Sequence, residues 1–155
     1  MSLPDHPMTS DPRAARIARG FEQLTPDTVA DLLAGYCPDA RFIDPFNDVQ
    51  GRARIGAILS HMFATLVQPR FEVRAITAEG AHAWLVWDFC FQRQPGGDEW
   101  RIHGATQLTF DAQGLVSLHR DYWDAAGELY AKVPVLGRLM RWLASRLRTP
   151  EGFKT

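Results

Sequence analysis

The sequence predicts a single α+β domain, in which a curved antiparallel β-sheet forms a cone and N-terminal helices pack on its concave face. The length of 155 residues is that of one domain with a real core. Apolar residues recur at helical spacing in the first half of the chain, whereas from residue 70 they alternate with polar residues. Helices that gather early and strands that gather late are typical of α+β domains.

Composition excludes several classes of protein. The chain is 46% hydrophobic and 23% charged, with a formal net charge of −1, so it has no field that would attract nucleic acid. It has neither an apolar run long enough for a membrane span nor a secretory signal, and we expect a cytoplasmic protein. Cys37 and Cys90 lack metal-site spacing and are expected to be small buried hydrophobes.

Two helix starts near the N-terminus share the same chemistry. The Asp11-Pro12 and Thr25-Pro26 pairs each place an N-cap residue before a proline suited to the first helical position. They predict helices over 12–23 and 26–35. Residues 1–11 are expected to be a disordered leader.

The middle of the chain combines one strand and one helix. Alternation and aromatic residues predict a strand over 40–46, which Pro45 breaks. The following stretch, GRARIGAILSHMFATL, places its apolar residues on one helical stripe. These residues are Ile55, Ile58, Leu59, Met62, Phe63 and Leu66.

Four strands and a last helix complete the prediction. Period-two alternation predicts strands over 70–80, 81–92, 99–110 and 114–124, and their short, turn-rich connections indicate an antiparallel meander. We take 12–131 as the domain. Residues 132–155 are expected to add a basic amphipathic helix, which could serve as a lid, as a dimer element or as a contact with a membrane surface.

This order of elements, together with the stretch YCPDARFIDPFNDVQGRARIGAIL, resembles the nuclear transport factor 2-like superfamily over about residues 12–130. That superfamily includes ketosteroid isomerases, SnoaL-type polyketide cyclases and limonene-epoxide hydrolases. The most specific matches are Asp44-Pro45, the Gly51 and Ile55 spacing, and RDYWD at the end of the last strand. The fold hosts enzymes and non-enzymes, so it does not define the function.

The resemblance makes Asp44 a candidate general base, because an Asp-Pro at this place supplies the base in ketosteroid isomerase-like proteins. The alternative is that Asp44 caps the turn before Pro45 and contacts backbone amides. The oxyanion hole of the isomerases is not reproduced in the sequence. The tyrosine of the first helix falls at about Gly20 or Phe21, and the second donor falls at about Thr106, so the familiar steroid isomerisation is not expected.

A second catalytic set is implied by the likeness to limonene-epoxide hydrolases. Asp121 matches the first aspartate of their Asp-Arg-Asp set, and Asp88 falls within a residue of the second. Val86 stands where the bridging arginine is expected, so His119 or His103 would have to bridge the carboxylates. The alternative is that Asp88 and Asp121 bind tryptophan or tyrosine donors and hold the sheet together.

The remaining candidates are residues that could contact a ligand in an apolar pocket. These are Tyr36, Phe46, Phe63, Trp84, Thr106 and Trp123. No His/Cys/Asp cluster has metal spacing and no phosphate loop is present, so neither a metal nor another cofactor is expected.

We therefore expect a homodimer that associates through the outer sheet face and holds a small hydrophobic molecule in an apolar pocket. One hypothesis is a cofactor-free acid–base enzyme of the isomerase, cyclase or hydrolase type, with Asp44 or Asp121 as base and His119 as proton partner. The others are a non-catalytic binding module and an interaction protein whose pocket is filled by side chains.

Overall fold

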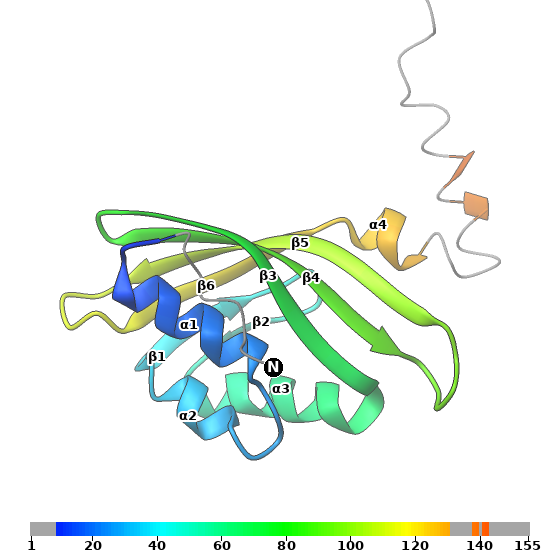
Figure 1. Cartoon of the computed structure of the whole chain (residues 1–155), viewed down its shortest axis with the longest axis horizontal. Coiled ribbons are helices and arrows are strands. Elements are labelled where there is room, and N and C mark those ends of the chain that lie inside the picture. Colours follow the sequence, from blue (N-terminus) through cyan, green and yellow to red (C-terminus); the bar gives the residue numbers. More distant parts are fainter. Residues whose placement is uncertain (1–8, 131–137, 140, 143–155) are drawn as a thin grey trace, which may run out of the picture. The chain divides into compact units, whose positions relative to one another are not determined.

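The computed structural model describes residues 9–130, 138–139 and 141–142 of the chain. Up to Trp123 these residues form one compact unit, in which three helices lie against a curved sheet of six strands (Figure 1). The helices are α1 (Pro12–Glu22), α2 (Val29–Leu33) and α3 (Arg52–Thr65). The strands are β1 (Tyr36–Ile43), β2 (Asp48–Gln50), β3 (Val67–Glu79), β4 (His82–Gln92), β5 (Glu99–Phe110) and β6 (Val116–Trp123).

The sheet has the order β2-β1-β6-β5-β4-β3. Strands β3 to β6 form the predicted antiparallel meander. Strand β1 differs from the prediction, because it runs parallel to β6, with Phe42 beside His119. The sheet is therefore mixed, and this pairing brings the first strand of the chain against the last.

The helix starts follow the capping chemistry at one site and not at the other. The Asp11 carboxylate accepts hydrogen bonds from the backbone N–H groups of Arg13 and Ala14, and α1 begins at Pro12 as predicted. In α2 the helix starts three residues later than predicted. Thr28 binds back to Thr25 instead, through its hydroxyl, so residues 26–28 form a turn and the helix begins at Val29.

The boundaries of the strand before Pro45 also differ from those predicted. Strand β1 begins at Tyr36, four residues before the predicted start, and ends at Ile43. The three-residue strand β2 was not predicted; it pairs antiparallel with β1 across the turn at residues 44–47. Because β1 reaches back to Tyr36, that side chain lies inside the core, where it is only 1% exposed.

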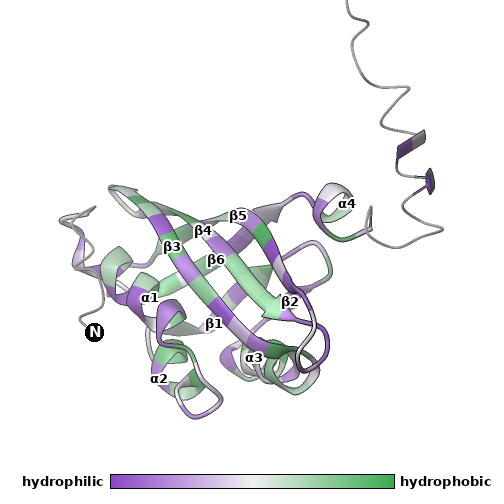
Figure 2. Ribbon diagram, turned by 45° about the vertical axis from the view of Figure 1, so that its right-hand side comes forward, coloured by the Kyte–Doolittle hydropathy of each residue, from purple (hydrophilic) through white to green (hydrophobic). Residues whose placement is uncertain are grey.

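The core lies between the helices and the concave face of the sheet. Helix α1 contributes Ala14, Ile17 and Ala18, and apolar residues alternate along the strands that face it (Figure 2). Cys37 and Cys90 are free and buried, as expected. Among the described residues, no helix is long and apolar enough to cross a membrane.

The second compact unit covers residues 124–155. It contains the short helix α4 (Ala125–Glu128), in which Asp124 accepts a hydrogen bond from the backbone N–H of Gly127. Of the helix predicted over 132–155, only 138–139 and 141–142 are described; these residues are helical and exposed. The rest of that prediction lies outside the described residues.

Candidate functional site

Five side chains from four strands form a continuous hydrogen-bonded row on the concave face of the sheet. The indole Nε1 of Trp87 lies 2.8 Å from Thr106 Oγ1, which lies 2.5 Å from Asp121 Oδ1. His119 Nε2 lies 2.8 Å from the same Oδ1, and its Nδ1 lies 2.8 Å from the Tyr36 hydroxyl. We call these residues the Asp121 network.

The two ends of the Asp121 network fix the direction of every hydrogen bond in it. An indole N–H can only donate, so Thr106 must accept from Trp87 and pass its own hydrogen to Asp121. At the other end, the Tyr36 hydroxyl has no hydrogen-bond partner other than His119 among the described residues, and it is buried. It therefore donates to Nδ1, because a buried O–H left without an acceptor costs free energy.

These directions define the state of His119. Since Nδ1 accepts from Tyr36, the ring of His119 is neutral and carries its hydrogen on Nε2, which donates to Asp121. Burial, and secondly the nearby Asp121 charge, raise the pKa of Tyr36 well above its ordinary value, so that hydroxyl stays protonated. Both branches of the network, from Trp87 through Thr106 and from Tyr36 through His119, thus end on one carboxylate oxygen.

The second carboxylate oxygen of Asp121 is left for another partner. Both side-chain hydrogen bonds to Asp121 from the described residues end on Oδ1, and the side chain is 18% exposed. Next to it is a cavity of about 20 Å³. The cavity is lined by Ile17, Phe21, Phe71, Val73, Leu85, Trp87, Thr106, His119 and Asp121. A buried water needs about 10–15 Å³, so the cavity as it stands holds one or two heavy atoms.

An open groove of about 530 Å³ also reaches Asp121. It is lined by Ile43, Asp44, Pro45 and the end of β6, residues 120–123. At its edge the exposed ring of Phe46 meets Trp123 edge-on, with ring centroids 5.6 Å apart. Asp121 is thus the residue shared by the groove and the cavity.

Asp44 lies at this groove, but its carboxylate is occupied by its own turn. Oδ1 accepts from the backbone N–H groups of Phe46 and Asn47 and from the Asn47 amide, which also reaches Oδ2. This is the turn-capping alternative considered for Asp44, since its side chain accepts hydrogen bonds from backbone N–H groups of its own turn.

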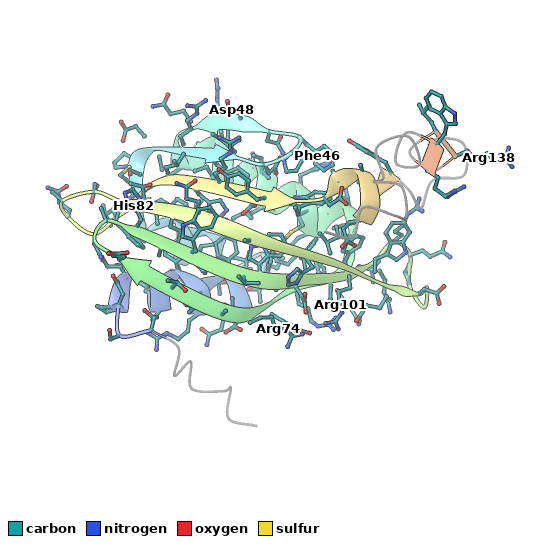
Figure 3. The ribbon with its side chains drawn as sticks, turned by 90° about the horizontal axis from the view of Figure 1, so that it is seen from above. Phe46, Asp48, Arg74, His82, Arg101 and Arg138 are labelled. Carbon is teal, nitrogen blue, oxygen red and sulfur yellow. The ribbon has the colours of Figure 1, made fainter. Side chains whose placement is uncertain are left out.

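Asp88 does not lie with Asp121, and this corrects its expected place in the pocket. On β4 the side chain of Trp87 faces the cavity, so its neighbour Asp88 points to the outer face of the sheet. There Arg74, Arg101 and His103 contact its carboxylate at 2.8–3.0 Å. Figure 3 labels the two arginines of this group. The hydrogen bond from His103 is the largest cause that lowers the pKa of Asp88.

The candidate ligand contacts divide among three places. Tyr36 and Thr106 belong to the Asp121 network, Phe46 and Trp123 lie at the groove, and Phe63 packs against the core from α3. Trp84 lies elsewhere: it is 42% exposed on the outer sheet face beside Tyr122. Successive side chains of a strand point to opposite faces, and Leu85, the residue after Trp84, faces the cavity. Trp84 therefore points outward.

Six residues of the cavity lining are not among the site residues expected from the sequence: Ile17, Phe21, Phe71, Val73, Leu85 and Trp87. Phe21 falls near the position of the isomerase tyrosine, but neither it nor Phe71 nor Trp87 is among the ligand contacts expected from the sequence. The alternation of β4 places Leu85 and Trp87 on one face and could have identified Trp87. Within the described part of the chain, no group of three or more His, Cys, Asp or Glu residues is placed to hold a metal ion.

Comparisons with known proteins show the family and the fold of the chain. The sequence profile of the SnoaL-like domain family matches residues 17–119. The steroid Δ-isomerase of Nocardioides simplex is 28% identical over 124 residues, which cover 79% of this chain and 96% of the isomerase.

Solved structures show the same fold at low sequence identity. A hypothetical protein with a ketosteroid isomerase-like fold from Catenulispora acidiphila, solved in complex with trimethylamine, has a TM-score of 0.66 at 15% identity and covers 78% of this chain and 92% of its own. An NTF2-like protein of unknown function from Burkholderia pseudomallei has a TM-score of 0.65 at 15% identity and covers 76% and 95%.

Proposed function

The chain belongs to the SnoaL-like domain family of the NTF2-like superfamily, and from this premise we propose that it is a cofactor-free acid–base catalyst. Asp121 is the residue that takes a proton from a small hydrophobic molecule and returns it. The reaction is of the isomerase, cyclase or hydrolase type, and the likeness to a steroid Δ-isomerase supports acid–base chemistry in general.

One observation carries this proposal: both side-chain hydrogen bonds that the described residues make to Asp121 end on Oδ1. Oδ1 accepts from Thr106 and His119 whether Oδ2 is bare or carries a proton. A proton can therefore arrive at Oδ2 and leave again without breaking any bond of the network. A general acid–base catalyst needs such a group, held in place and within reach of the substrate in both of its protonation states.

His119 and Tyr36 act in this proposal as positioning residues. The side chain of His119 is 2% exposed, and its Nε2–H donates to Asp121. If it took up a proton at Nδ1, the Tyr36 hydroxyl would lose its acceptor inside the core. The imidazole therefore orients the carboxylate, and this replaces the proton-partner role that the sequence suggested for it.

The test is proton exchange in heavy water. Wild type, Asp121→Asn and Asp44→Asn are incubated with small hydrophobic ketones, epoxides and amines, and products and deuterium uptake are followed by mass spectrometry. We expect Asp121→Asn to lose about 10²–10⁴-fold in rate, the usual contribution of a general acid–base group. Asp44→Asn, which can keep its turn, should retain the activity. Equal loss in both variants, or loss in Asp44→Asn alone, contradicts the proposal.

A second candidate is a non-catalytic binding or interaction module, and the small cavity favours it. With about 20 Å³ free, the concave face is almost filled by side chains, among them Phe21 and Phe71. A substrate larger than a few atoms has to displace these rings or use the groove beside Asp121. Binding without exchange in the same assay supports this candidate.

We also propose that the chain works as a cytoplasmic homodimer. The support is an aromatic patch on the outer face of the sheet, where Trp84 and Tyr122 are each 42% exposed and their rings lie 5.6 Å apart. The half-buried residues Val86 and Ala105 lie beside them on β4 and β5. A second copy of the same patch would cover these rings from water.

A further inference from the structure

The cavity beside Asp121 has an unusual balance of hydrogen-bonding groups. Its lining contains three groups that donate: the Trp87 indole, the Thr106 hydroxyl and the His119 Nε2–H. Each of them already donates within the Asp121 network. The lining therefore offers a ligand one acceptor, Asp121 Oδ2, and no uncommitted side-chain donor.

The remaining walls are apolar and largely aromatic. Phe21 meets Phe71 edge-on with centroids 5.3 Å apart, and Phe71 meets Trp87 edge-on at 5.8 Å. Ile17, Val73 and Leu85 complete the lining, and neither Lys nor Arg is part of it. Aromatic faces carry partial negative charge and attract cations, most strongly where water is excluded.

This balance disfavours ligands that carry negative charge. A ketone that loses a proton places negative charge on its oxygen and needs donors aimed at that oxygen. A carboxylate ligand would face Asp121 as a like charge. A positively charged donor meets neither problem, since its N–H reaches Oδ2 and its charge lies against the aromatic walls.

We infer that the cavity beside Asp121 selects a small organic cation that donates a hydrogen bond, namely a protonated amine. The inference deepens the proposed function, since it names the substrate class of the same site. The free volume sets the size of the group that enters without rearrangement. Methylammonium has two heavy atoms and matches about 20 Å³, whereas larger ammonium ions have to move Phe21 or Phe71.

The test uses the indole N–H of Trp87 as a reporter, because it lies in the lining and binds Thr106. Its nuclear magnetic resonance signal is followed while methylammonium, methanol or formate is added, with sodium chloride keeping the ionic strength constant. We expect a saturable shift with methylammonium, at an affinity about tenfold or more above that of methanol, and no shift with formate. Equal affinities, or a shift with formate alone, overturn the inference.

Two variants make the test specific. Asp121→Asn can keep an acceptor at Oδ1 and places an amide N–H₂ at Oδ2, so it should lose methylammonium and gain formate. Such an inversion cannot come from unfolding. Asp88→Asn, whose carboxylate lies on the opposite face of the sheet, is the matched control and should bind as wild type does. If Asp121→Asn binds methylammonium unchanged, the cation lies elsewhere and the inference is wrong.

The inference and the proposed function fail in different ways. Saturable methylammonium binding with no deuterium exchange on any substrate keeps the cation site and removes the catalysis. Exchange on ketones or epoxides that requires Asp121, with no binding of methylammonium, keeps the catalysis and removes the cation site.

Discussion

The Oγ1 atom of Thr106 lies 2.5 Å from Oδ1 of Asp121 and 2.8 Å from the indole nitrogen of Trp87. Thr106 thus joins the aromatic wall of the cavity to its carboxylate. Gly104, which is paired with Trp87 on β5, makes this contact possible. A Cβ at position 104 would lie 2.5 Å from Cη2 of Trp87, so the ring can lie over this strand only because the residue is glycine.

Replacing Thr106 with valine should destabilise the fold although the side chains have nearly the same shape. The change leaves the Trp87 indole N–H without its acceptor inside the core, which costs about 1–3 kcal/mol. Urea unfolding followed by tryptophan fluorescence measures the loss. Thr109→Val is a matched control on the outer face of β5, where the hydroxyl contacts His82 at the surface. Equal losses in both variants would contradict the network.

Tyr36 should make the stability of the fold fall at alkaline pH. The pKa of its buried hydroxyl is raised above the ordinary tyrosine value of 10.0, so above that pH the unfolded chain releases a proton that the folded chain keeps. The contribution of Tyr36 is therefore complete below about pH 10 and decreases as pH rises toward the raised pKa, by about 1.4 kcal/mol per unit at most.

The measurement is urea unfolding of wild type and Tyr36→Phe between pH 8 and 11. At pH 8 the variant should be less stable by about 1 kcal/mol, because His119 Nδ1 loses its donor. The difference between the two proteins should shrink as the pH rises above 10. A difference that stays constant over this range would show that Tyr36 ionises as readily in the folded chain as in the unfolded one.

The sequence was sufficient for the fold because each long element has a clear period. The meander from β3 to β6 and the helix α3 follow directly from alternation and from one apolar stripe. The parallel pairing of β1 with β6 could not be predicted from local patterns, since it joins residues about 80 positions apart in the chain. It depends on the path of the chain between these two strands, which includes α3.

The candidate site could be predicted only where the face of a strand was read correctly. His119 and Asp121 are two residues apart and share the concave face, as expected. Asp88 falls within one residue of the position that the resemblance gives the second aspartate of the epoxide hydrolases. A shift of one residue is enough to move a side chain to the other face of a sheet. The link from Trp87 to Thr106 needs the register of two strands, which no local pattern contains.

Asp88 should therefore matter for stability and not for the site. Its side chain is 12% exposed and binds Arg74, Arg101 and His103, and its pKa is lowered, mainly by His103. A lowered pKa stabilises the fold above the ordinary carboxyl value of 3.8, and this contribution is lost as pH falls through the lowered pKa. Asp88→Asn should cost about 1 kcal/mol at pH 7 and weaken the acid dependence.

Urea unfolding between pH 2 and 7 measures this effect, and the exchange and binding assays complete the test. Asp88→Asn should keep the methylammonium affinity and any exchange activity of the wild type, since its carboxylate lies across the sheet from Asp121. Asp121→Asn should instead lose the methylammonium affinity and any exchange activity, and should keep the acid dependence of wild-type stability. Loss of binding in a folded Asp88→Asn protein would connect the two faces of the sheet and contradict their assigned roles.

The patch of Trp84 and Tyr122 should determine the oligomeric state. Two exposed aromatic rings on the outer face of β4 and β6, the strands on either side of β5, form an apolar surface that a second copy can cover. Trp84→Lys removes one ring and would place two like charges near the symmetry axis of a dimer, so we expect sedimentation velocity to show two chains for the wild type and one for the variant. Gln113→Lys adds the same charge in the turn between β5 and β6 and should remain a dimer. If the wild type sediments as a single chain, this face is exposed to solvent and the proposed homodimer is wrong.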